Sequence, residues 1–195
     1  MSKAHDLISE IKKLEAELVL EIQQQEKKFF YRTEDKKVIF DDTTQKLHKI
    51  KATNLFVYLS ETPFKHMLTL PIIWFGLFPA LFMDLVVSIY QFTCFRLYGI
   101  PQVKRSDYIV IDRQNLKYLN FIERMNCVYC GYFNGLIAYV QEISARTEQY
   151  WCPIKHAAKL KTMHSHYHNF LEYGDYEDYQ NKLIEIRKKF DELKK

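Results

Sequence analysis

The sequence predicts a mainly α, membrane-associated helical protein with an apolar helical hairpin, a minor two-stranded β ribbon and paired terminal helices. Three observations favour this class. Gly and Pro number only five each in 195 residues, which disfavours a loop-rich all-β fold. Both ends carry apolar residues at helical spacing, and residues 67 to 95 contain one formal charge. The net charge of +4 is only mildly basic, so we expect no nucleic-acid partner.

The pattern divides the chain into four parts. The opening residues, "MSKAHDLISEIKKLEAEL", are charged throughout, unlike a secretory signal. Four cysteines without such a signal indicate a reducing compartment, where close cysteines bind metal or do redox chemistry. The expected parts are N-terminal amphipathic helices and a short strand (1–62), a membrane-inserted apolar hairpin or span (63–100), a helical pair with a Cys/His metal site (101–172) and a C-terminal amphipathic helix (173–195).

The two ends predict one-sided helices that need a partner. The simplest interpretation is that they pack on each other as antiparallel helices. The alternative is that each packs on the core, or on a second copy in a homo-oligomer. The apolar positions are Leu7, Ile11, Leu14, Leu18 and Ile22 within residues 4–31, and Tyr176, Tyr179, Leu183, Ile186, Phe190 and Leu193 at the other end.

Two short runs are typical of strands. "KKVIFD" at 36–41 and "DYIVID" at 107–112 are rich in β-branched and aromatic residues. We expect them to pair as the small ribbon. A helix is expected between the first run and the apolar region, at about 43–60.

Residues 64–100 are long and apolar enough to meet a bilayer. Pro71, Gly76 and Pro79 interrupt the stretch, which favours a hairpin that enters the membrane and returns to the same side. A single span at about 79–97 and a buried hairpin of a soluble protein are the alternatives. Basic residues mark the cytoplasmic side, and they flank both ends, at Lys46, Lys49, Lys51 and Lys65 before the stretch and Arg96, Lys104, Arg105 and Arg113 after it. This symmetry favours the hairpin, with the bulk of the chain on the cytoplasmic side of an inner membrane.

Asp84 is the charge inside this stretch. A carboxylate in an apolar segment faces protein, water or a partner, so Asp84 is a candidate intramembrane polar site for a cation or a proton. The plainer interpretation is a hydrogen-bonded structural residue. Arg96 lies too far along one helix to be its i, i+4 partner.

Cysteine and histidine spacing predicts a metal site. "CVYC" places Cys127 and Cys130 one turn apart on a helix expected at 113–146. In "CPIKH", Pro153 suits the first position of a new helix, with Cys152 as its cap and His156 one turn on. A helix–turn–helix would then close a four-ligand set of the kind that structural zinc uses.

Other chemistry is compatible with these ligands. An iron–sulfur cluster, a dithiol pair at Cys127 and Cys130, and haem at Cys152 are alternatives to zinc, as are buried small cysteines. Cys94 stands apart as a further candidate ligand or a packed apolar residue. The residues expected to orient the ligands, or else to form a solvated or paired helix face, are Glu123, Glu142, Arg146 and Glu148.

The segment "HSHYH" supplies His164, His166 and His168, which are either a second metal site or exposed histidines. Residues 98–157, which contain both cysteine motifs, resemble an uncharacterised group of small bacterial membrane-associated proteins. The resemblance implies a bacterial origin and carries no activity.

The sequence therefore favours a membrane-associated, cytoplasm-facing protein that binds zinc in a Cys3His site and acts as an interaction or scaffold module. Its expected partners are the lipid bilayer and a second protein chain. The aromatic face of Tyr129, Tyr132, Phe133 and Tyr139 suits partner binding or a core. The alternative is a membrane-bound metal-dependent or thiol redox enzyme that uses Cys127 and Cys130, with Glu142, Glu148 or Asp84 handling protons. Of these two, the sequence favours the non-enzymatic interpretation.

Overall fold

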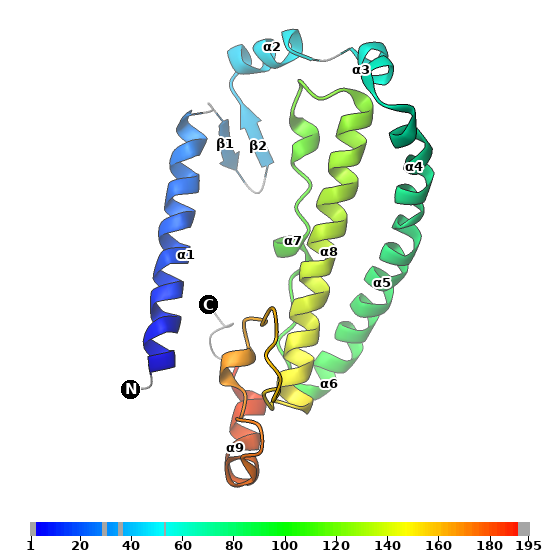
Figure 1. The fold of residues 1–195 in the computed structure, drawn as a ribbon. Coiled ribbons are helices and arrows are strands. Elements are labelled where there is room, and N and C mark those ends of the chain that lie inside the picture. Colours follow the sequence, from blue (N-terminus) through cyan, green and yellow to red (C-terminus); the bar gives the residue numbers. More distant parts are fainter. Residues whose placement is uncertain (1–2, 29–30, 35–36, 53, 191–195) are drawn as a thin grey trace. The chain divides into compact units, whose positions relative to one another are not determined.

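The computed structural model describes residues 3–28, 31–34, 37–52 and 54–190 (Figure 1). The mainly α class is confirmed. The chain divides into two compact units, residues 1–61 with 112–125, and residues 62–111 with 126–195. In chain order the elements are α1 (Lys3–Lys28), β1 (Tyr31–Glu34), β2 (Lys37–Phe40), α2 (Asp42–Ile50), α3 (Leu55–Glu61), α4 (Phe64–Phe75), α5 (Leu77–Tyr90), the π-helical turn η1 (Gln91–Phe95), α6 (Arg96–Tyr98), α7 (Arg105–Tyr108), the 3-10 turn η2 (Arg113–Asn115), α8 (Phe121–Trp151), the 3-10 turn η3 (Tyr167–Asn169) and α9 (Tyr176–Lys188).

The first unit contains an antiparallel strand pair. β1 pairs with β2, with Tyr31 opposite Phe40. The predicted partner of this ribbon, 107–112, is wrong, because that segment forms α7 and an extended stretch instead. The expected helix at 43–60 is two helices, α2 and α3. Aromatic rings connect the strands to α2 and to the segment before α8, because Phe40 contacts His48 and His48 contacts Tyr118, both edge-on at 5.0 Å between ring centroids.

The apolar stretch forms one continuous helical path from Phe64 to Tyr98, so the predicted hairpin is wrong. The backbone hydrogen bond from Ala80 N–H to the Gly76 carbonyl carries the helix past the glycine. Pro79 lies in the first turn of α5, where its missing N–H is tolerated. The helix breakers in the sequence therefore do not reverse this segment.

Helix α8 runs parallel to this path in the second unit. Tyr129 donates a hydrogen bond to the Ile73 carbonyl at 2.9 Å, and further along Tyr90 and Thr147 share one at 3.2 Å. Because both helices advance in the same direction, residues 99–120 must return along them. Gly135 lets this return segment approach closely, since a Cβ there would lie 2.6 Å from the Tyr108 carbonyl oxygen.

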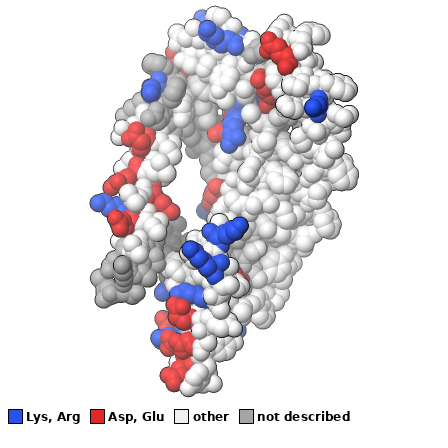
Figure 2. Space-filling model, viewed as in Figure 1, with Lys and Arg blue, Asp and Glu red and all other residues white. Residues whose placement is uncertain are grey.

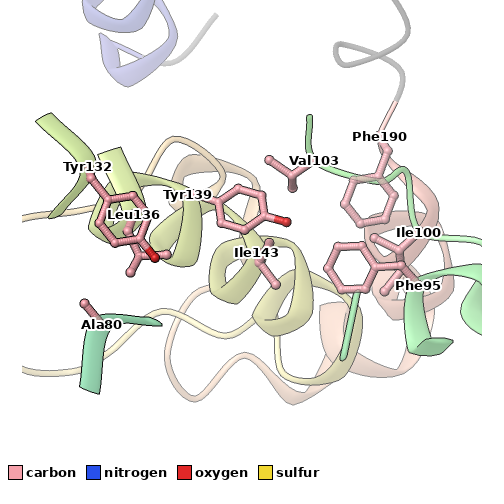
Figure 3. Packing of buried hydrophobic residues seen from close by; sticks show 9 residues of the cluster. All are labelled: Ala80, Phe95, Ile100, Val103, Tyr132, Leu136, Tyr139, Ile143 and Phe190. Atoms are coloured by element: carbon pink, nitrogen blue, oxygen red, sulfur yellow. The ribbon is translucent and has the colours of Figure 1, made fainter. Parts of the chain in front are cut away.

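The core of the second unit lies between the apolar path, the return segment and α8 (Figure 3). Gln91 anchors it, because its amide both donates to the Val103 carbonyl at 3.1 Å and accepts from the Val103 N–H at 3.0 Å. The same amide donates to the Tyr139 hydroxyl at 2.6 Å. The buried apolar cluster is Ala80, Phe95, Ile100, Val103, Tyr132, Leu136, Tyr139, Ile143 and Phe190.

The two terminal helices belong to different units, so their mutual pairing stays a prediction. Two apolar residues of the C-terminal pattern, Ile186 in α9 and Phe190 just after it, are buried within their own unit. The apolar residues of α1, such as Leu14 and Leu18, are more than half exposed.

Candidate functional site

The structure does not bring the four predicted metal ligands together. Cys127 and Cys130 lie one turn apart on α8, as predicted, but α8 continues unbroken to Trp151. At 1.5 Å per residue, Cys130 and Cys152 are about 30 Å apart along this helix, far beyond the reach of one ion. Within the residues that the structure describes, no three His, Cys, Asp or Glu side chains are placed to hold a metal.

The helix expected to start at Pro153 is also absent from the described segment that follows α8. Residues 152–166 are extended or turn-like, and His156 belongs to this loop. Its backbone N–H donates to the Tyr167 hydroxyl at 2.7 Å. All four cysteines are free thiols, including Cys94, so a dithiol role for Cys127 and Cys130 stays a prediction.

Glu123 caps the start of α8 and does not orient a metal ligand. Its carboxylate accepts from the Asn120 N–H at 2.9 Å, and the Asn120 side chain accepts from the Glu123 N–H at 3.0 Å. This reciprocal capping box explains why α8 starts at Phe121 and not at 113.

The remaining predicted polar residues form a buried network at the far end of α8. The expected i, i+4 pair is present, with Arg146 Nε 2.8 Å from Glu142 Oε1. His166 Nε2 lies 3.1 Å from the same oxygen, and His166 Nδ1 lies 2.7 Å from Gln149 Oε1. Arg146, Gln149 and His166 are 6%, 0% and 7% exposed. His166 is therefore buried, and the alternative that all three histidines are exposed is wrong for this residue.

Gln149 fixes the direction of the hydrogen bonds in this network. Its amide nitrogen donates to the carbonyls of Ile186 and Lys189, at 3.0 and 2.8 Å, so its oxygen faces His166 as an acceptor. Glu142 is the acceptor on the other side. Both ring nitrogens of His166 thus face acceptor oxygens, one from Gln149 and one from Glu142. The network joins α8, the loop before η3 and α9.

The charges of this network act on one another. Burial raises the pKa of Glu142, but hydrogen bonds from His166 and Arg146 and their charges outweigh it and bring the pKa to about 2. His164 pairs with Glu148 at 3.0 Å. Burial lowers the pKa of His164, although Glu148 opposes that shift. His168 is exposed. The predicted acid–base groups Glu142 and Glu148 are therefore engaged in pairs within the structure.

Asp84 has a partner that sequence reasoning missed. Arg105 donates to it, with Nη2 2.6 Å from Oδ2, and the Tyr132 hydroxyl donates to the same oxygen at 2.9 Å. Ser88 adds a bond at 3.3 Å. The structural interpretation of Asp84 is the one that the geometry supports. Sequence spacing along one helix could not reveal Arg105, because the chain leaves the helix and returns before reaching it.

The opposite face of α4 and α5 is exposed and wholly apolar. Every exposed residue from Pro71 to Phe92 is apolar, and the ten large ones are between 46% and 74% exposed. Figure 2 shows the corresponding surface over α5 without charged side chains. They are Ile72, Ile73, Phe75, Phe78, Leu81, Phe82, Leu85, Val86, Ile89 and Phe92, and together with Pro71 and Pro79 we call them the apolar face.

A soluble monomer rarely exposes one contiguous apolar patch of more than roughly a few hundred Å². This face exposes ten large apolar side chains, each by 46% or more. Among the residues that the structure describes, the helix Phe64–Tyr98 is the single one long and apolar enough to cross a membrane. Compared with protein-family models, curated proteins and solved structures, the chain matches none. The function must therefore be argued from this geometry.

Proposed function

We propose that the protein is a monotopic membrane protein that lies on one side of a bilayer through the apolar face, and that the rest of the second unit serves as a non-enzymatic interaction module. The single observation that supports this is the unbroken exposed apolar surface from Pro71 to Phe92. Contact with acyl chains would remove it from water, and this burial is favourable by about 25 cal/mol per Å².

The charged return segment favours a flat helix over a spanning one. Residues 71 to 92 cover about 32 Å, close to the thickness of a hydrocarbon core. Asp84 lies near the middle of that length, and its partner Arg105 belongs to a segment, 104–107, that is exposed throughout. A perpendicular helix would place these charges and non-helical backbone near mid-depth, where each charge costs about 3 kcal/mol on insertion scales.

A helix lying in the plane of the interface avoids this cost. Ala80, Asp84 and Gln91 follow at helical spacing on the side opposite the apolar face. With the apolar face in one leaflet, these residues and the return segment point away from lipid. Lys65 and Arg96 are exposed near the two ends of the helix, where basic side chains reach headgroups. We place the protein on the cytoplasmic side for this reason.

Vesicle flotation of the purified full chain tests membrane binding. Phe82→Asp puts a charge in the centre of the apolar face and should lower the partition coefficient at least a hundredfold, because Phe burial contributes about 2 kcal/mol and the charge adds its own cost. Met163→Asp, at a 67% exposed apolar position in the loop after α8, is the matched control and should bind like wild type. Equal binding by both variants would refute the assignment of the apolar face.

The orientation is tested by tryptophan depth. With Trp74 and Trp151 replaced by Phe, single tryptophans are introduced at Phe75, Phe82 and Ile89, and brominated lipids quench each according to its depth. A flat helix gives the same shallow depth at all three positions. A spanning helix places Phe82→Trp deepest, and that result would overturn the monotopic arrangement.

A further inference from the structure

A cavity of about 290 Å³ lies at the end of the apolar helical path. Its walls include Tyr98 at the end of α6, Pro101 from the segment that follows, Tyr150 from α8, and Arg187 and Lys188 from the last turn of α9. Three segments that are distant in sequence thus meet around one space. Among its described lining residues there are two cations and no carboxylate.

Arg187 lies at this cavity with one buried donor that has no acceptor. Its Nε is buried and has no hydrogen-bond partner. The guanidinium carbon lies 6.0 Å from the centre of the Tyr150 ring, which itself stacks on Tyr98 at 5.3 Å. No ion pair of Arg187 or Lys188 is found among the described residues. A buried guanidinium N–H without an acceptor is unfavourable, and an oxyanion in the cavity would supply one.

The carbonyl groups at the C-terminal end of α9 oppose an anion in this cavity only weakly. A helix C-terminus carries partial negative charge, which would oppose an incoming anion. Gln149 already donates to the Ile186 and Lys189 carbonyls and so satisfies part of that end. The planar guanidinium remains available for bidentate binding of a phosphate.

The position of the cavity indicates where its ligand comes from. Tyr98 ends the same helical path that carries the apolar face, and the preceding Leu97 is 81% exposed. If the apolar face lies in one leaflet, the cavity stands at headgroup level. We propose that it binds the phosphate of an anionic phospholipid headgroup, with Arg187 and Lys188 as the phosphate ligands. This site rests on the proposed membrane binding and gives it lipid selectivity.

The test compares vesicles of phosphatidylcholine with vesicles in which about 30% of the lipid is phosphatidylglycerol, which gives the surface a negative charge. The full chain carries either Arg187→Gln with Lys188→Gln, or the matched charge loss Lys159→Gln with Lys161→Gln in an exposed loop of the same unit. Wild type should gain roughly thirtyfold in partitioning from phosphatidylglycerol, about a factor of five or six per basic residue. The cavity variant should lose most of this gain, and the loop variant less than threefold. All three should bind phosphatidylcholine equally.

The other outcomes separate the explanations. Equal losses in both double variants would show general surface charge and overturn the site. Inorganic phosphate and glycerol phosphate are titrated without vesicles, with the melting temperature as readout. Stabilisation of wild type but not of the cavity variant, together with an unchanged phosphatidylglycerol gain in both, would assign the cavity to a soluble phosphate and overturn the lipid assignment. Failure to bind either vesicle would refute the membrane proposal, and this site with it.

Discussion

Replacement of Gly135 by Ala should destabilise the second unit, although Ala is the better helix former. The new Cβ would lie 2.6 Å from the Tyr108 carbonyl oxygen and 2.8 Å from the Ile109 Cα. Both atoms belong to backbone, so the return segment must move by several tenths of an ångström. Such overpacking costs about 3 kcal/mol, while helix propensity returns about 1 kcal/mol, which leaves a net loss near 2 kcal/mol.

Gly131 provides the matched control, one turn earlier on the same helix. A Cβ there meets only the Val110 carbonyl oxygen, at 3.3 Å, which a small adjustment relieves. Gly131→Ala should therefore keep most of the propensity gain and be neutral or more stable by up to about 1 kcal/mol. The assay is urea unfolding of the full chain in mild detergent, followed by far-UV circular dichroism. If Gly135→Ala is as stable as Gly131→Ala, the close packing of the return segment on α8 is refuted.

Three further predictions concern the network and the start of α8. Gln149→Met removes three hydrogen bonds and leaves their partners buried, so it should cost about 3–5 kcal/mol and increase hydrogen exchange in α9; a loss below about 1 kcal/mol would contradict the anchoring role. Glu142 has a lowered folded-state pKa of about 2 against an ordinary 4.5, so its contribution is complete above pH 4.5 and is lost as pH falls from there through 2. Urea unfolding from pH 5 to 2 should show this loss, of about 2 kcal/mol after allowance for screening, and Glu142→Gln should remove it; an identical pH profile in the variant would argue against the pairing. Asn120→Ala should cost about 1 kcal/mol in thermal unfolding, whereas Asn120→Asp keeps the cap acceptor and should restore stability; equal losses would dismiss the capping box.

Local patterns in the sequence predicted local structure well. The helix carrying Cys127 and Cys130 and the pairing of Glu142 with Arg146 are both present. Each depends on spacing within a few residues, which helix geometry fixes directly.

The structure does not bring the two halves of the expected metal site together, because of the longer spacing between them. A gap of 21 residues fits a helix–turn–helix, but it also fits one long helix. The stretch from Leu136 to Trp151 contains neither Gly nor Pro, and this absence of a stop signal favoured the continuous helix.

Pairings across the chain could not be read from the sequence. The run at 107–112 has the composition of a strand, yet it packs on α8 where Gly131 and Gly135 leave room for backbone. Arg105 reaches Asp84 only because the chain reverses after Tyr98. Neither arrangement produces a periodic pattern in the sequence, because both depend on which surfaces meet after the helices form.

The parallel course of α8 and the apolar path has a consequence during synthesis. Tyr129, which bonds to Ile73, lies 56 residues after it in the chain, and Thr147 lies 57 residues after its partner Tyr90. At 5–20 residues per second, the apolar helix emerges about 3–11 s before the surface that covers its inner face. During that interval the inner face is also uncovered, and Asp84 lacks its hydrogen bond from Tyr132. Early capture by a bilayer or a chaperone would therefore decide whether the chain reaches this fold or aggregates on the ribosome.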